Sequence, residues 1–138
     1  MKYICFGYID KSRWEAMSET ERAAFLDDCA AHSQMLKSRG NLLVAQALQG
    51  AESAATLHLQ NGRISVTDGP FAETKEQLGG FMLLEARDLN HAIQLVSNHP
   101  GVRLGPFELR PIDEHNSCQN LEMRRIRTAN HADFADSK

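Results

Sequence analysis

The chain has 138 residues, of which 42% are apolar and 24% are charged, and its net charge is −3. This length suits one domain with its own core, and the charge gives no reason to expect nucleic acid or an anionic membrane as a partner. The sequence has no apolar run of the roughly 20 residues that span a bilayer and no signal-peptide pattern, so we expect a cytoplasmic protein.

The N-terminal part of the chain predicts a strand followed by a long helix. Residues 2–9 alternate as a strand with apolar side chains on both faces, so this strand is expected to be covered on both sides. Ser18 and Glu21 form a capping box, which predicts a helix that runs to about Arg39, where Gly40 supplies the stop.

One stripe of this predicted helix carries candidate functional side chains. The stripe consists of Phe25, Cys29, His32 and Leu36, at spacings of four, three and four residues. Residues at these spacings share a helix face, so we expect His32 to face the sheet.

The middle of the chain predicts a second strand and a hairpin. The second strand covers about residues 42–48. Residues 55–60 and 63–68 form the two hairpin strands, joined across Asn61 and Gly62, the pair best suited to a type I′ turn.

The remaining elements are a strand, a helix, a strand and a tail. Residues 81–86 predict a strand, Asp88 caps a second helix that Pro100 closes, and the last strand covers about residues 102–112. Residues 113–138 are polar and charged, and we interpret them as a tail that is either mobile or strapped onto a partner subunit.

This order of elements predicts an α+β fold: a ferredoxin-like split βαβ domain over residues 1–112 with an extra β-hairpin. Two helices can cover only one face of such a sheet. Because the first strand is apolar on both faces, the other face is expected to pack on a second copy, giving a homodimer with a dimeric α+β barrel.

The most informative motif begins at Asp68-Gly69-Pro70-Phe71, where three turn-prone residues force a sharp bend. The segment from Asp68 through Gly79-Gly80-Phe81 resembles the signature of the YCII-related family, in the branch named after the Asp-Gly-Pro-Phe motif. The resemblance covers about residues 1–112 and implies the same dimeric α+β barrel.

The resemblance also has functional implications. A few similar members are associated with cofactor-independent chemistry on small molecules, and others are linked to sigma-factor-type transcription regulators. Members related to the YCII type pair a helix histidine with an aspartate before a proline. The corresponding positions here fall near Cys29 and on His99, so this chain does not carry the intact pair.

Three residues are candidates for catalysis, each with a simpler structural explanation. His32 can act as a base in a cleft between helix and sheet, or it can be a core histidine with satisfied nitrogens. Asp68 can orient an imidazole or act as a base, or it can only form an Asx-turn. His99 can take part in catalysis or simply complement the C-terminal end of the second helix.

Five further residues are candidates for substrate binding. Gly69 and Pro70 shape the motif's bend, Phe71 can form a pocket wall, and Lys75 and Arg110 can bind an anionic group or lie in solvent. We expect His32 and Asp68 to share a cavity lined by Phe71 and an aromatic residue of the first strand.

Two functions fit these observations. The first is a small-molecule enzyme that transfers a proton with an imidazole and a carboxylate, as in a lyase, an isomerase or a dehalogenase, without a cofactor. The second is a non-catalytic ligand-binding or accessory protein. A metal site built from His32, His99 and Asp68 has suitable ligand types but no supporting local spacing, and with three cysteines lacking a Cys-x-x-Cys pair we predict no metal.

Overall fold

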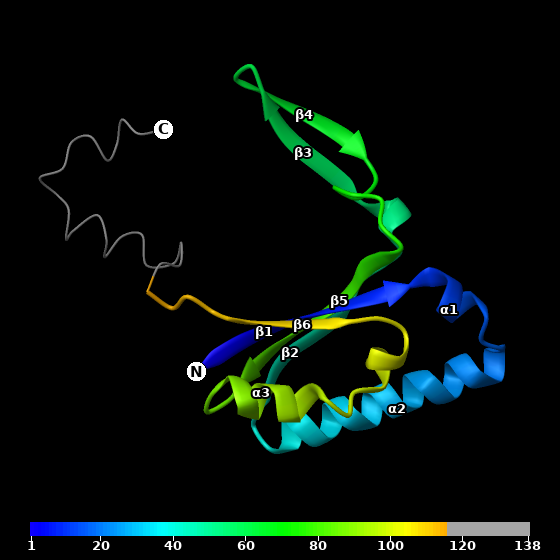
Figure 1. Cartoon of the computed structure of the whole chain (residues 1–138), viewed down its shortest axis with the longest axis vertical. Coiled ribbons are helices and arrows are strands. Elements are labelled where there is room, and N and C mark those ends of the chain that lie inside the picture. The colour runs from blue at the N-terminus through cyan, green and yellow to red at the C-terminus, as the bar shows by residue number, and fades with distance from the viewer. Residues whose placement is uncertain (116–138) are drawn as a thin grey trace, which may run out of the picture.

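Two helices lie on one side of an antiparallel sheet, and a hairpin rises on the other side, in the computed structural model of the chain (Figure 1). The structure describes residues 1–115. The strands are β1 (Lys2–Asp10), β2 (Leu42–Ala47), β3 (Ala55–Gln60), β4 (Arg63–Asp68), β5 (Glu76–Glu85) and β6 (Phe107–Pro111). The helices are α1 (Lys11–Glu15), α2 (Glu19–Ser38) and α3 (Leu89–Val96), with two 3₁₀ turns, η1 (Ala51–Ser53) and η2 (Pro100–Arg103).

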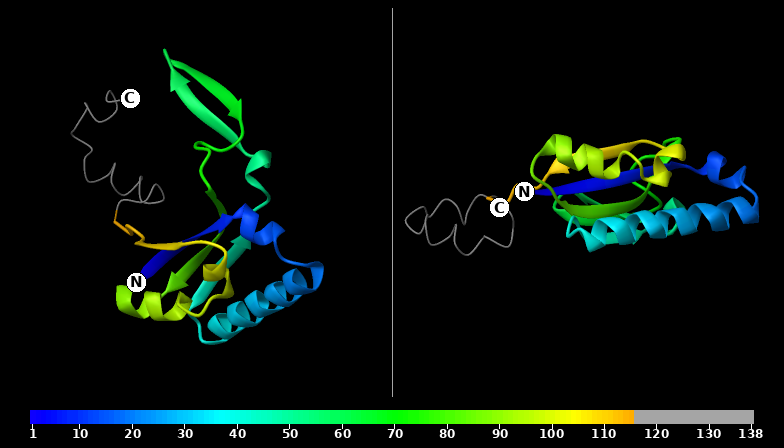
Figure 2. Two further views of the ribbon diagram at one scale, coloured as in Figure 1. Left: turned by 45° about the vertical axis from the view of Figure 1, so that its right-hand side comes forward. Right: turned by 90° about the horizontal axis from the view of Figure 1, so that it is seen from below.

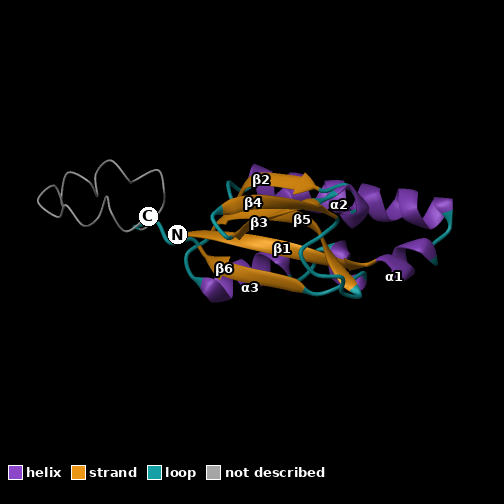
Figure 3. Ribbon diagram, turned by 90° about the horizontal axis from the view of Figure 1, so that it is seen from above, coloured by secondary structure: helices purple, strands orange, loops and turns teal. Residues whose placement is uncertain are grey.

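The main sheet has the strand order β2-β5-β1-β6, and every neighbouring pair in it is antiparallel (Figure 3). Helix α2 connects β1 to β2, and α3 connects β5 to β6. This is the ferredoxin-like split βαβ arrangement, so the predicted α+β fold class is confirmed.

Helix α2 begins and ends where the sequence predicts. The Ser18 side chain accepts a hydrogen bond from the Glu21 N–H, and the Glu21 carboxylate accepts one from the Ser18 N–H. Gly40 follows the helix with φ +78°, a conformation that glycine adopts without steric cost. Phe25, His32 and Leu36 are buried, as their shared stripe predicts.

The short helix α1 was not predicted. Asp10, the last residue of β1, caps it by accepting a hydrogen bond from the Ser12 N–H. An aspartate followed by a polar turn is a recognised helix start, but five residues are too few to show a periodic apolar pattern.

The hydrophobic core fills the space between the main sheet and the two helices. Its members include Tyr3, Cys5, Leu36, Leu42, Met82, Leu84, Ala92, Leu95 and Val96. Removing such side chains from water stabilises the fold by about 1.5–3 kcal/mol for each large residue. The core therefore fixes α2 and α3 against one face only.

The opposite face of the main sheet is also apolar. Ile4 and Phe6 of β1 and Leu83 of β5 alternate with the core-facing residues, and Val44 of β2 pairs with Leu83. Ile4, Phe6 and Leu83 are only partly buried, and Val44 is exposed. In Figure 1 neither α2 nor α3 lies on this side. The helices therefore cover one face of the sheet and leave the other apolar face open, as the sequence predicts.

The predicted hairpin forms a separate two-stranded sheet, β3–β4, and does not extend the main sheet. Asn61 and Gly62 both have positive φ angles, 52° and 77°, so the predicted type I′ turn is confirmed. The left-hand view in Figure 2 shows the hairpin projecting away from the helices and the main sheet.

Three predicted boundaries were wrong. Strand β5 begins at Glu76, not at residue 81, because its N-terminal residues pair with the end of β1. Helix α3 ends at Val96, before Pro100. Residues 100–103 form the 3₁₀ turn η2, so the last strand begins only at Phe107.

Two further predictions concern the rest of the chain. The predicted tail falls mostly on residues 116–138, which lie outside the described residues, so its placement stays a prediction. No helix within residues 1–115 has the length and apolar character needed to cross a membrane.

Candidate functional site

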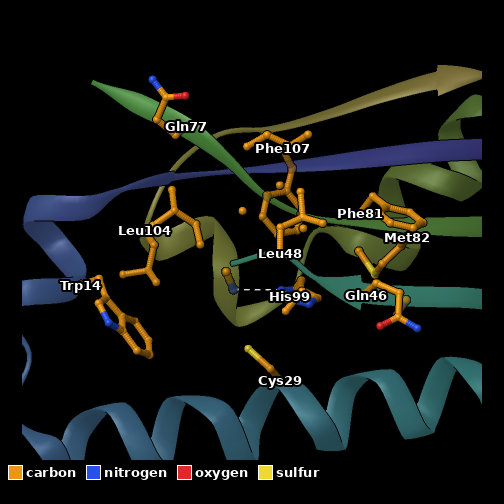
Figure 4. Close-up of a pocket in the computed structure, with 18 of the residues that line it drawn as sticks. Trp14, Cys29, Gln46, Leu48, Gln77, Phe81, Met82, His99, Leu104 and Phe107 are labelled. Carbon is orange, nitrogen blue, oxygen red and sulfur yellow. Dashed lines mark hydrogen bonds between the residues drawn. The ribbon is translucent and has the colours of Figure 1, made fainter. Parts of the chain in front are cut away.

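A pocket of about 740 Å³ lies between α2 and the main sheet (Figure 4). Most of its lining is apolar. The large apolar residues are Ile9, Trp14, Phe25, Leu26, Leu48, Leu78, Phe81, Met82, Leu104 and Phe107. In Figure 4 Trp14 and Leu104 lie at one end and Phe81 and Met82 at the other, with His99 between them.

Few polar residues line this pocket. They are Lys11, Ser33, Gln46, Gln49, Glu52, Gln77 and His99, besides the thiols of Cys5 and Cys29. Glu52 is the one carboxylate among the lining residues, and His99 is the one imidazole. A largely apolar cavity with a few polar groups is typical of a small-molecule site.

His99 is fixed by the loop that connects α3 to η2. Its Nδ1 atom accepts a hydrogen bond from the Gly101 N–H at 2.9 Å. A neutral imidazole whose Nδ1 is an acceptor carries its proton on Nε2. Nε2 makes no hydrogen bond to residues 1–115, so this N–H is free to donate to a bound molecule.

Burial keeps the His99 ring neutral. Desolvation, with a smaller contribution from nearby His32, lowers the pKa of His99 from 6.5 to about 4. The ring also packs 5.0 Å from the Phe107 ring, measured between centroids. At neutral pH His99 therefore offers a hydrogen-bond donor without a positive charge.

His32 lies behind His99. The two ring centroids are 5.0 Å apart, and the rings meet edge to face at 71°. His32 is buried, and neither Nδ1 nor Nε2 has a hydrogen-bond partner in good geometry. Burial lowers the pKa of His32, while the nearby Leu95 carbonyl opposes this shift. The Leu95 carbonyl is the backbone group that faces this imidazole, so the catalytic role and the core-histidine alternative both stay predictions.

Comparison with known proteins identifies the family. The YCII-related domain matches residues 1–116. The uncharacterized protein R00369 of Rhizobium meliloti (strain 1021) is 34% identical over 114 residues, which cover 81% of this chain and 92% of that protein. The chain belongs to the YCII-related family.

Similar solved structures include the following one. It is the 5-chloro-2-hydroxyhydroquinone dehydrochlorinase TftG from Burkholderia phenoliruptrix AC1100, in complex with 2,5-dihydroxybenzoquinone. The TM-score is 0.46 and the sequence identity 16%, over 85% of this chain and 100% of that chain. The named reaction and compound belong to that protein.

Cys29 lies on the same helix stripe as His32 and lines the pocket, where Figure 4 shows it pointing away from α2 into the pocket. Burial, and to a smaller extent Asp28, raises the pKa of the Cys29 thiol. The thiol is thus protonated at neutral pH and is not an activated nucleophile. Cys29 and His99 both line this pocket, and they stand at the positions where the resemblance implies the family's histidine and aspartate.

Asp68 does not join the two histidines within one chain. It ends β4 in the hairpin sheet, where it pairs with Ala55, and it is exposed. The pocket is lined by neither Asp68 nor Phe71, so the predicted cavity shared by His32 and Asp68 was wrong. Within residues 1–115 no cluster of three metal-ligating side chains is present, and the alternative of a His32, His99 and Asp68 metal site loses its carboxylate.

The Asp-Gly-Pro-Phe motif closes the base of the hairpin. The Gly69 N–H donates to the Ala54 carbonyl at 2.7 Å, and the Thr56 hydroxyl donates to the Gly69 carbonyl at 2.9 Å. Gly69 has φ +94°, which favours glycine, and Pro70 follows it. These residues shape the chain where it leaves β4, and Phe71 beside them is exposed.

The two predicted anion-binding residues have partners within the chain. Lys75 Nζ lies 3.5 Å from Asp10 Oδ2, which ties the segment after the motif to the end of β1. Arg110 Nε donates to Glu108 Oε2 at 2.6 Å on the face of the main sheet that α2 and α3 leave open. Neither residue lines the pocket, and their predicted contact with a substrate is not part of this geometry.

Sequence reasoning missed Glu52 and Gly101. Glu52 lies in η1 on the connection between β2 and β3, where no periodic pattern marks it. Gly101 follows His99-Pro100, and a Cβ atom there would lie 3.0 Å from His99 Nδ1 and 2.7 Å from Phe107 Cζ. The His-Pro-Gly sequence was a signal for this tight turn, because only glycine leaves room for the imidazole.

Proposed function

We propose that this member of the YCII-related family is a small-molecule enzyme whose substrate occupies the pocket between α2 and the main sheet. The pocket volume of about 740 Å³ is within the range of small-molecule sites, and its lining suits a compact, largely apolar compound. Because Gly101 holds His99 Nδ1, the imidazole keeps its Nε2–H as a hydrogen-bond donor. The proposed compound therefore carries an oxygen that accepts this hydrogen bond.

The proposed role of His99 follows from its tautomer. With Nδ1 held by Gly101, the ring cannot accept a proton from the pocket without losing that bond. His99 therefore donates through Nε2 and stabilises negative charge that forms on a substrate oxygen when a neighbouring proton leaves. A donor of this kind, in place before the reaction, contributes on the order of 10²–10³ in rate.

Glu52 is the proposed base, in place of the predicted Asp68. Its carboxylate is the acidic group among the pocket-lining residues, and it lies beside Gly50, where an added Cβ would collide with the carboxyl group. The proton leaves the substrate carbon for Glu52 while His99 holds the oxygen. Proton transfer next to a carbonyl or hydroxyl group is the first step of the isomerase, lyase and dehalogenase reactions considered from the sequence, and it needs no cofactor.

The observation that carries the proposal is the unpaired His32 beside His99. A buried imidazole whose nitrogens lack hydrogen bonds in good geometry lowers stability by about 1–3 kcal/mol relative to a well-paired one, and the role we propose for it is support of the His99 ring. His32 is a positioning residue in this proposal, because it contacts the His99 ring and does not line the pocket.

A second candidate is a ligand-binding protein without catalysis. The apolar lining and the single imidazole favour it, since binding needs only a cavity and one hydrogen-bond donor. In this case the chain serves as an accessory protein, and a sigma-factor-type regulator is the partner that family resemblance suggests.

The homodimer is likewise a proposal. Ile4, Phe6, Leu83 and Val44 form an apolar sheet face that α2 and α3 do not cover. A second copy that packs the same face against it removes this surface from water and completes the dimeric barrel.

Deuterium exchange tests the enzyme proposal. The full chain is incubated in D₂O with a panel of small cyclic ketones, diketones and hydroxyaromatic compounds, and proton NMR measures exchange at carbon. We expect exchange for at least one compound, and at least a 100-fold loss in His99→Asn and in Glu52→Gln. The matched controls, His58→Asn and Glu73→Gln, lie outside the pocket and should keep the activity.

Two outcomes contradict the enzyme proposal. Exchange that survives both pocket substitutions would remove His99 and Glu52 from the chemistry. Ligand-observed NMR that detects binding of panel compounds without any exchange would favour the accessory protein.

A further inference from the structure

One face of the β3–β4 hairpin, here called the arm (residues 55–68), is an uncovered apolar surface. Leu57 pairs with Val66 and Leu59 with Ile64 across the two strands, so the four side chains share a face. Each of them is between 60% and 72% exposed. Together they form one contiguous apolar patch, and contiguous exposed apolar patches mark interaction sites on protein surfaces.

The other face of the arm is polar. The pairs there are Thr56 with Thr67, His58 with Ser65 and Gln60 with Arg63. Antiparallel sheets with one apolar and one polar face normally pack the apolar face against protein and leave the polar face in water. The arm therefore has the pattern of a sheet that is covered on one side.

Nothing within residues 1–115 provides that cover. The arm strands pair only with each other, and neither the main sheet nor the helices pack on them extensively. An isolated two-stranded hairpin is marginally stable in water. A partner that covers the apolar face would therefore stabilise the arm.

We infer that the apolar face of the arm docks on a second copy of this chain. This inference rests on the proposed homodimer. The arm rises on the side of the main sheet that the helices leave open, so one second copy packed on Ile4, Phe6 and Leu83 lies beside the arm as well (Figure 1). In a two-fold dimer each molecule then gives one arm and receives one.

The size of the contact supports a second copy as the occupant. A stable interface buries about 800 Å² on each partner, which is more than one arm face supplies. The open sheet face and the arm face together provide the larger surface. Both are mostly apolar, apart from the Glu108–Arg110 ion pair on β6, and interfaces of obligate homodimers are likewise rich in apolar surface.

Docking of the arm also affects the pocket. Leu48, Gly50 and Glu52 line the pocket on the connection that leads into the arm, and Gln77 and Leu78 line it where the chain returns. The base of the arm is therefore a wall of the pocket. A second copy that holds the arm fixes this wall, and with it the position of the Glu52 carboxylate.

The test compares two double substitutions on opposite faces of the same strands. Leu59→Lys with Ile64→Glu places an opposite-charge pair on the apolar face and keeps the net charge. Gln60→Arg with Arg63→Gln exchanges two residues on the polar face and also keeps the net charge. Sedimentation velocity of the full chain from 1 to 100 μM, as a practical range, measures the dimer dissociation constant, and circular dichroism checks the fold.

We expect a wild-type dimer, at least a 10-fold weaker dimer for the apolar-face variant, and an unchanged dimer for the control. A second double variant, Leu57→Thr with Val66→Thr, keeps residues that favour strands and should also weaken the dimer. It replaces the first apolar-face variant if that variant does not fold. An apolar-face variant that dimerises like the wild type would overturn the docking of the arm and leave the dimer intact. A polar-face control that dissociates as much as the apolar-face variant would also overturn the docking of the arm. A wild-type chain that stays monomeric would overturn both the docking of the arm and the proposed homodimer.

Discussion

The imidazole rings of His32 and His99 meet edge to face with their centroids 5.0 Å apart, although 67 positions separate them along the chain (99 − 32). One ring comes from the buried stripe of α2, and the other from the residue that caps η2. Because His99 lines the pocket and His32 lies behind it, the pair joins the core to the candidate site.

The pH dependence of stability should report on His99. Its pKa is about 4 in the folded chain, and near 6.5 in the unfolded chain, so the unfolded state binds more protons between these values. Stability therefore falls as the pH is lowered from about 6.5 to 4. After allowance for partial solvent access, we expect a loss on the order of 2 kcal/mol.

Denaturant unfolding of wild type and His99→Asn at several pH values measures this effect. The amide oxygen of asparagine can still accept from the Gly101 N–H but does not titrate. In His99→Asn the free energy of unfolding should change much less with pH between about 4 and 6.5 than in the wild type. An unchanged pH dependence would show that other groups cause it.

Replacing His32 with phenylalanine should not destabilise the fold. The substitution removes two buried ring nitrogens that lack partners, so we expect unchanged stability or a gain of about 1 kcal/mol. Leu36→Ala is the control, because Leu36 is a fully buried apolar residue. It should lower the free energy of unfolding by about 2–5 kcal/mol, which would show that the assay detects changes in the core. A loss of several kcal/mol in His32→Phe would mean that the nitrogens are paired after all.

Gly101→Ala should disturb the His99 ring. The added Cβ would lie 2.7 Å from Phe107 Cζ and 3.0 Å from His99 Nδ1, so the turn or the ring must move. We expect a destabilisation of about 1–3 kcal/mol and a changed His99 side-chain resonance in NMR spectra. Gly40→Asn, at a site with positive φ and open space, is the control and should leave that resonance in place.

The ion pair of Lys75 and Asp10 should be visible in the titration of Asp10. Hydrogen bonds from Ser12 lower the pKa of the Asp10 carboxyl most, and Lys75 lowers it further. In Lys75→Met we expect this pKa to rise but to stay below its usual value, since the Ser12 bonds remain. NMR titration of the carboxyl group measures the change, and no rise would show that Lys75 is not bound there in solution.

The sequence predicted the parts of the fold that have local causes. The Ser18 capping box, the Asn61-Gly62 turn and the α2 stripe each depend on residues close together in the chain. The start of β5 at Glu76 depends on its pairing with β1, which no local pattern records.

The candidate site was predicted only in part. His32 and His99 were both selected as single residues, but their contact depends on how α2 packs against η2. Asp68 was joined to them because its carboxylate ends an apolar row, and that row turned out to be the uncovered face of the arm. Glu52 went unnoticed because a loop carboxylate has no spacing that predicts its place in a pocket.

The most direct test of the central claim is NMR of the nitrogen-15 labelled histidine side chains, recorded from pH 8 to pH 3.5. The claim predicts a neutral His99 with its proton on Nε2 at pH 7, an acceptor Nδ1, and a pKa of about 4. A His99 that titrates near 6.5, or that carries its proton on Nδ1, would contradict the proposed hydrogen-bond donor in the pocket.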